Sequence, residues 1–120
     1  MNTVLIADDS FFMRALIRRS LEEEGYRVVG EAENGTVCIK KFAECRPEIV
    51  TLDITMPEMN GIQTLTALMK MNPNVKVIMV SALGQEAIIK EAIAIGAKSF
   101  IVKPFKQDYF ISVLNKIAAG

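Results

Sequence analysis

The stretch EIVTLDITMPEMNG, residues 48–61, decides the fold. Its first half is an apolar run of the kind that forms a strand buried on both faces of a parallel sheet. The run ends on Asp53, and burying a carboxylate at the end of a strand is costly. The residues from Met56 to Gly61 are turn formers, which keep the chain from entering a helix directly. The stretch therefore predicts a buried strand whose charged end borders an open loop.

Four other short apolar runs surround this one at similar intervals. The five expected strands are Thr3–Ala7, Arg27–Ala32, Ile49–Leu52, Lys76–Val80 and Ser99–Val102. The sequence between them has apolar residues at helical spacing, so each interval holds one helix and two short loops. Five such units predict an α/β fold: a flavodoxin-like, doubly wound parallel sheet of five strands with five helices. Numbered along the chain, the expected strand order is 2-1-3-4-5.

Composition limits the classes of function. The chain has 120 residues, which we expect to form one domain over 1–120, and its 14 basic and 14 acidic residues cancel. That balance argues against a protein that binds nucleic acid or a membrane surface through a basic patch. No apolar run approaches the roughly 20 residues that span a bilayer. The N-terminus lacks the pattern of a signal peptide, and Cys38 and Cys45 are too far apart on one helix to form a disulfide. We expect a monomer in the cytoplasm.

Polar side chains follow four of the predicted strands. Asp8 and Asp9 follow the first strand, Asp53 the third, Ser81 the fourth and Lys103 the fifth. In a doubly wound sheet, ligands bind beyond the carboxyl ends of the strands, where the strand order reverses. We therefore expect these five side chains to meet at one edge of the sheet. A single polar residue after a strand would be explained as a helix cap. Helix capping does not explain polar residues at the ends of four strands that share one edge of the sheet.

Three carboxylates and one lysine leave this edge with a net charge of about −2. Two like charges about 4 Å apart repel by about 4 kcal/mol at an effective dielectric constant near 20. Oxygen ligands without histidine or thiolate select a hard divalent cation, and we expect Mg²⁺. With the cation and Lys103 in place, the site could accept a phosphoryl group. Asp53 is the best candidate nucleophile, because it stands alone at its strand end.

Four motifs in order along the chain, VLIADDSFFMR, DITMPEMNGI, VSA and IVKPF, closely resemble those of the receiver domain of bacterial two-component response regulators. The resemblance covers essentially the whole chain and is strongest to the single-domain chemotaxis type. It implies a signalling switch and not an enzyme with a separate substrate. Such a switch catalyses only its own phosphorylation and dephosphorylation. The phosphodonor it implies is a phosphohistidine on a sensor histidine kinase.

The resemblance also implies roles for single residues. Asp53 is the phosphoacceptor; Asp9 and Asp53 bind Mg²⁺ directly, Asp8 binds it through water, and the main-chain carbonyl of Thr55 completes the ligands from the protein. Lys103 contacts the phosphoryl group, and the Lys103-Pro104 bond is cis. The two switch residues are Ser81, which moves to the phosphoryl group, and Phe100, which then turns inward.

Two apolar surfaces suggest partners. On the fourth helix, one face accommodates Ile88, Ala92 and Ile95, which leaves Ile89 and Ile93 for a partner. The expected output face is helix 4, strand 5 and helix 5, with a flagellar motor switch protein as target and a phosphatase as a further partner. Of the adjacent Phe11 and Phe12, we expect one to pack against the fold and Phe11 to be exposed.

Two other functions were considered. The chain could act in a two-component pathway other than chemotaxis. It could also be a Mg²⁺-dependent phosphatase with an aspartyl-phosphate intermediate, but that chemistry needs an acid two residues after the nucleophile, where this chain has Thr55.

Overall fold

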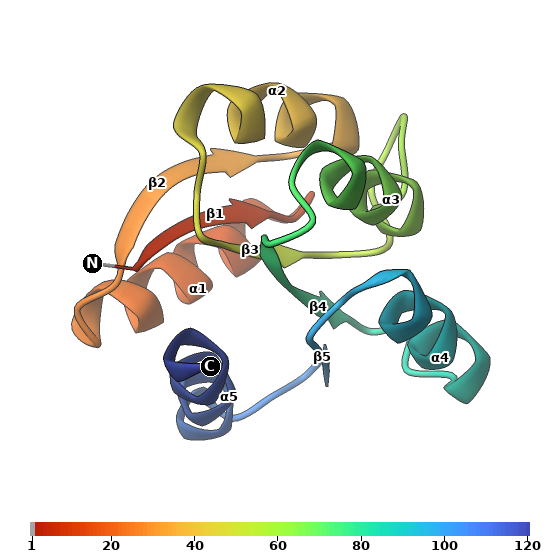
Figure 1. Ribbon diagram of the computed structural model, residues 1–120. Coiled ribbons are helices and arrows are strands. Elements are labelled where there is room, and N and C mark those ends of the chain that lie inside the picture. The colour runs from red at the N-terminus through yellow and green to blue at the C-terminus, as the bar shows by residue number, and fades with distance from the viewer. Residues whose placement is uncertain (1) are drawn as a thin grey trace.

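Five parallel strands and five helices alternate along residues 2–120, the part of the chain that the computed structural model describes (Figure 1). The strands are β1 (Thr3–Ala7), β2 (Arg27–Ala32), β3 (Ile49–Leu52), β4 (Lys76–Ser81) and β5 (Ser99–Val102). The helices are α1 (Phe11–Glu23), α2 (Gly35–Cys45), α3 (Gly61–Met71), α4 (Glu86–Ile95) and α5 (Gln107–Ala119). The strand order is β2-β1-β3-β4-β5, which confirms the predicted fold. Ser81 is the last residue of β4 and not the first residue after it.

The sheet is buried on both faces, which explains its near-continuous apolar strands. Helices α2, α3 and α4 cover one face, and α1 and α5 cover the other (Figure 1). Along β1, Leu5 and Ala7 pack toward the first group of helices, whereas Val4 and Ile6 pack toward the second. Because side chains alternate along a strand, both faces need apolar residues at every position.

The segment after β3 is shaped by close packing against the start of α3. Asn60 and Gln63 form a reciprocal capping box, which satisfies two free N–H groups at the start of the helix. The Gly61 N–H donates to the Ile54 carbonyl at 2.8 Å. A Cβ atom at position 61 would overlap the Asp53 carbonyl oxygen and lie 2.6 Å from the Ile54 Cα. Glycine at this position lets α3 pack directly on the backbone that carries Asp53.

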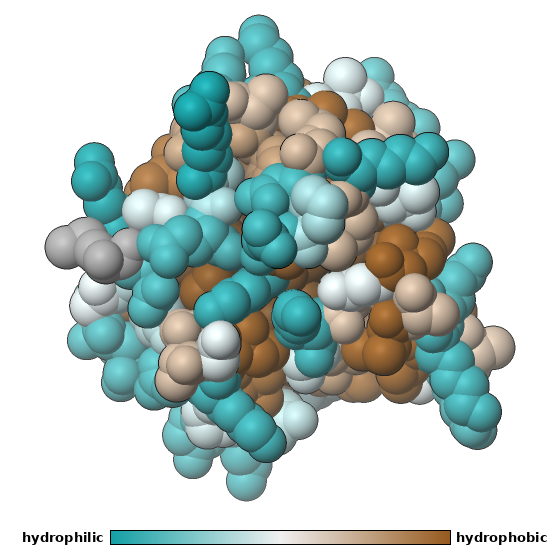
Figure 2. Space-filling model, in the orientation of Figure 1, coloured by the Kyte–Doolittle hydropathy of each residue, from teal (hydrophilic) through white to brown (hydrophobic). Residues whose placement is uncertain are grey.

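Exposed apolar side chains mark the two surfaces noted in the sequence. On α4, Ala92 is buried, Ile88 and Ile95 are partly buried against the core, and Ile93 is exposed, as expected, while Ile89 is partly exposed. Phe11 and Phe12 are 75% and 73% exposed, so the prediction that one of them packs against the fold was wrong. Both rings lie in the first turn of α1, before its buried face begins at Ile17. Figure 2 shows one face of the molecule, on which apolar patches are separated by polar side chains.

Within residues 2–120, each helix is too short or too polar to cross a lipid bilayer.

Candidate metal centre at the carboxyl edge of the sheet

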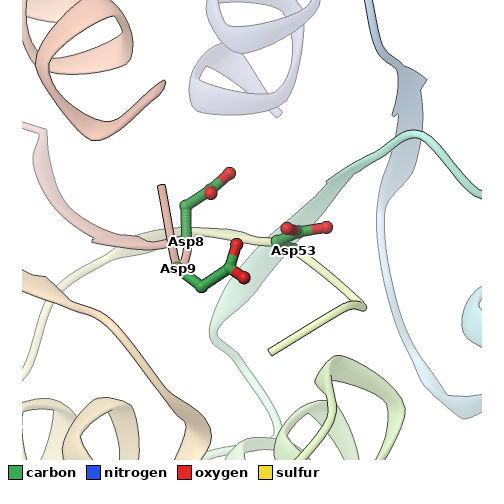
Figure 3. Close-up of side chains that lie close together, drawn as sticks. All are labelled: Asp8, Asp9 and Asp53. Carbon is green, nitrogen blue, oxygen red and sulfur yellow. The ribbon is translucent and has the colours of Figure 1, made fainter. Parts of the chain in front are cut away.

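Three carboxylates meet where β1 and β3 end. One oxygen each of Asp8, Asp9 and Asp53 lies within 4.8 Å of the others. Figure 3 shows Asp8 and Asp9 leaving the end of β1 beside Asp53 at the end of β3. β1 and β3 are hydrogen-bonded neighbours, and Ala7 pairs with Leu52. The register of the two strands thus places the acids that follow them side by side, as the sequence predicted.

Asp53 is held firmly in a buried position. Its side chain is 6% exposed, and its Oδ1 accepts the Ile54 N–H at 2.7 Å. Its Oδ2 lies 3.4 Å from the Lys103 Nζ. Burial raises the pKa of Asp53, and the nearby Asp8 raises it further. Lys103 and the Ile54 N–H oppose this rise without cancelling it. The charged form of this carboxylate therefore lacks sufficient compensation from the protein alone.

Asp8 and Lys103 form the strong ion pair of the site. The Lys103 Nζ lies 2.7 Å from the Asp8 Oδ2, and both side chains are largely buried. The other Asp8 oxygen accepts the Ser10 N–H at 2.9 Å. Lys103 therefore links Asp8 to Asp53, while Asp9 is exposed to solvent.

The remaining predicted residues border this cluster. Ser81 is fully buried, and its hydroxyl accepts the Leu83 N–H at 3.1 Å. The Lys103 N–H donates to the Ser81 carbonyl, so β4 and β5 present the two residues together. Thr55 is exposed two residues beyond Asp53, and Phe100 is half-buried against the core beneath α4. The Lys103-Pro104 peptide bond is cis, as the resemblance implied.

One residue that the sequence did not single out also contacts the site. Arg14, on α1, donates from Nη1 to the Asp8 main-chain carbonyl at 2.8 Å. Its Nε is 3.0 Å from Glu31, on β2, which also binds Arg18. Arg14 and Arg18 both lie on α1. Their spacing along the helix gave no sign of these contacts, which depend on β2 lying beside β1.

The donor set fits a hard divalent cation. The three side chains offer carboxylate oxygen only, and one of them is open to solvent. Mg²⁺ usually binds to one or two carboxylates and keeps several waters. An excess of acid over base, with a buried carboxylate whose pKa is raised, matches a site that a cation completes.

Comparisons with known proteins agree with this geometry. The family model described as the response regulator receiver domain matches residues 4–115. The chemotaxis protein CheY of Thermotoga maritima is 50% identical over 115 residues, which cover 96% of both chains. CheY of Bacillus subtilis is 46% identical over 113 residues and 94% of both chains. A CheX–CheY–BeF₃–Mg²⁺ complex from Borrelia burgdorferi contains a chain 37% identical to this one, with a TM-score of 0.95 over 97% of this chain and 88% of that one.

Proposed function

The chain belongs to the response regulator receiver domain family, and we propose that it accepts a phosphoryl group on Asp53, in the presence of Mg²⁺, as a signalling switch of the chemotaxis type. The observation that carries the proposal is the convergence of Asp8, Asp9 and Asp53 with Lys103 at one edge of the sheet. We take residues 1–120 as one receiver domain. Its two cysteines are free, which suits the reducing cytoplasm.

The residues divide the chemistry of transfer between them. Mg²⁺, held by Asp9, Asp53, the Thr55 carbonyl and, through water, Asp8, would supply positive charge to the phosphoryl oxygens. The Asp53 carboxylate attacks phosphorus, an O–P bond forms, and the bond to the donor's histidine nitrogen breaks. The electron pair of that bond returns to the imidazole. Lys103 lies within reach of Asp53 and balances charge on the phosphoryl group.

The phosphoryl group changes the site by adding about −2 charge and three acceptor oxygens. In the proposed switch, the Ser81 hydroxyl leaves the Leu83 N–H and donates to one of these oxygens. This movement frees space below the loop before α4, and Phe100 turns inward to fill it. Because Leu83, Ile88 and Phe100 pack against the same core, the change reaches α4 and β5.

The proposed partners follow from this switch. A sensor histidine kinase supplies the phosphoryl group, and the face formed by α4, β5 and α5 binds a flagellar motor switch protein. Exposed Ile93 and Tyr109 offer apolar contacts on that face. A phosphatase is the proposed means of resetting the switch, and the CheX–CheY complex from Borrelia burgdorferi supports the binding of a further protein partner. The chain itself catalyses only the gain and loss of its own phosphoryl group.

Transfer from a protein donor tests the proposed function. A chemotaxis-type histidine kinase, autophosphorylated with radiolabelled ATP and freed of ATP, is mixed with the wild-type chain and Mg²⁺. We expect label to move to the wild-type chain within seconds to minutes and Asp53→Ala to stay unlabelled. Asp108→Ala, which removes an exposed acid on α5, is the matched control and should accept label normally. Label on Asp53→Ala, or none on the wild type, would refute the proposal.

Partner choice is tested separately with the phosphoryl analogue beryllofluoride. The loaded chain should bind a purified motor switch protein at least tenfold more tightly than the free chain. Equal binding of both forms would contradict the proposed output, and it would leave phosphoryl transfer to be judged by the first experiment.

A further inference from the structure

The Arg14 guanidinium is fixed by three contacts on three sides. Its Nη1 donates to the Asp8 carbonyl at 2.8 Å, and its Nε donates to Glu31 at 3.0 Å. Its Cζ lies 5.8 Å from the centre of the exposed Phe11 ring, within range of a cation–π contact. The Arg14 side chain is only 13% exposed. Such a guanidinium has little freedom left and can hold a backbone carbonyl in one orientation.

Glu31 is in turn fixed by its own partners. Its second carboxylate oxygen binds the Arg18 Nε, and its main-chain carbonyl accepts the Lys41 ammonium at 2.6 Å. Partial burial of Glu31 raises its pKa, but hydrogen bonds from Arg18 and Arg14 outweigh that rise, so the pKa of Glu31 is lowered. Glu31 is therefore charged at neutral pH, and it offsets the charge of Arg14.

Asp9 depends on its backbone more than the other two acids do. The Asp8 and Asp53 carboxylates each bind Lys103 and a backbone N–H. Within residues 2–120, the Asp9 carboxylate forms no hydrogen bond or ion pair and is exposed. The Asp8 carbonyl and the Asp9 N–H belong to one rigid peptide plane. Holding that carbonyl therefore fixes the position of the Asp9 Cα and limits the directions in which the Asp9 side chain can leave the backbone.

We propose that Arg14, oriented by Glu31, is a positioning residue that aims the Asp9 carboxylate at Asp53 and so raises the affinity of the site for Mg²⁺. This inference rests on the magnesium site of the proposed function. Residues that orient metal ligands in this way typically contribute 10- to 100-fold to metal affinity.

The sign of the effect separates positioning from simple electrostatics. Arg14 is a cation close to an acidic site, so its charge alone repels Mg²⁺. If charge were its only influence, Arg14→Gln would bind Mg²⁺ more tightly than the wild type. If Arg14 positions Asp9, the same variant binds Mg²⁺ more weakly.

Calorimetric titration of the metal-free chain with MgCl₂ tests this inference. We expect the dissociation constant of Arg14→Gln to be about tenfold higher than that of the wild type. Arg19→Gln is the matched control, because it removes the same charge from α1. Among residues 2–120, Arg19 pairs only with exposed Glu23, so this variant should bind Mg²⁺ like the wild type. Glu31→Gln should weaken binding less than Arg14→Gln, because the amide oxygen can still accept from Arg14.

Amide NMR spectra supply a readout that loss of stability alone would not change. In Arg14→Gln without metal, the Asp9 N–H resonance should shift, while resonances in α3 stay in place. If Arg14→Gln does not fold, Arg14→Lys replaces it, with the same expected weakening. If Arg14→Gln binds Mg²⁺ as tightly as the wild type or more tightly, the role of Arg14 is overturned, but the magnesium site itself is not. A wild-type chain that binds no Mg²⁺ would overturn the magnesium site as well.

Discussion

At the scale of single residues, burial disfavours the charged form of the Asp53 carboxylate. Burial raises its pKa above the ordinary value of 3.8, so the folded chain holds this proton more tightly than the unfolded chain does. Between the ordinary and the raised pKa, the free energy of unfolding therefore falls as pH rises. The free energy of unfolding lost over this pH range is the cost of keeping a charged carboxylate at the end of β3.

Asp53→Asn should remove that cost. We expect the metal-free variant to melt at a higher temperature than the wild type at pH 7, with the difference shrinking as the pH falls toward 3.8. Differential scanning calorimetry across this range checks the prediction. Glu48→Gln, which neutralises an exposed acid, is the control and should change little. A variant that is less stable than the wild type at pH 7 would show that Asp53 is better compensated than we infer.

A second single-residue prediction concerns Thr51, in the middle of β3. Its hydroxyl is the one buried side-chain polar atom without a hydrogen-bond partner in residues 2–120. Thr51→Val should raise the free energy of unfolding by about 1 kcal/mol, because it removes an unsatisfied group and keeps the shape. Thr64 is also buried, but its hydroxyl donates to the Asn60 carbonyl at 2.8 Å, so Thr64→Val should lower stability by about 1 kcal/mol. Urea unfolding of both variants decides the matter, and equal effects would refute our account of Thr51.

At the scale of elements, Gly61 joins the helix α3 to the backbone of the site. Gly61→Ala should cost about 2–3 kcal/mol of stability, since its Cβ meets backbone atoms that cannot move aside easily. It should also weaken Mg²⁺ binding, because the displaced atoms belong to Asp53 and Ile54. Gly30→Ala is the comparison: its Cβ would lie 3.3 Å from the flexible end of Leu5, and we expect less than about 1 kcal/mol. Urea unfolding and a Mg²⁺ titration of both variants measure the two effects.

The elements were also the part of the structure that the sequence predicted best. β1, β3 and β4 are short apolar runs that are buried along almost their whole length, which identifies them as strands. β1, β2, β3 and β5 have the expected bounds. The acids could be placed because carboxyl ends of parallel strands share an edge. Contacts between elements could not be placed in the same way. Arg14 reaches Glu31 only because β2 lies beside β1, and Phe11 and Phe12 are exposed because α1 turns its first residues away from the core.

At the scale of the whole molecule, cation binding should couple to stability. A ligand that binds only the folded chain adds about 2.7 kcal/mol at 100 times its dissociation constant. We expect Mg²⁺ to raise the melting temperature of the wild type and EDTA to reverse the rise. Asp9→Asn should lose most of the response, whereas Asp108→Asn should keep it, because Asp108 lies on the surface of α5. An unchanged melting temperature of the wild type at high Mg²⁺ would argue against the metal site.

The most direct test of the central claim locates the phosphoryl group itself. The wild-type chain is incubated with the small phosphodonor acetyl phosphate, with either Mg²⁺ or EDTA. It is then reduced with borohydride, which converts an aspartyl phosphate into homoserine, and its peptides are sequenced by mass spectrometry. We predict homoserine at position 53 in the Mg²⁺ sample and none in the EDTA sample. Homoserine at Asp8 or Asp9, or equal conversion of Asp53 in EDTA, would contradict the account.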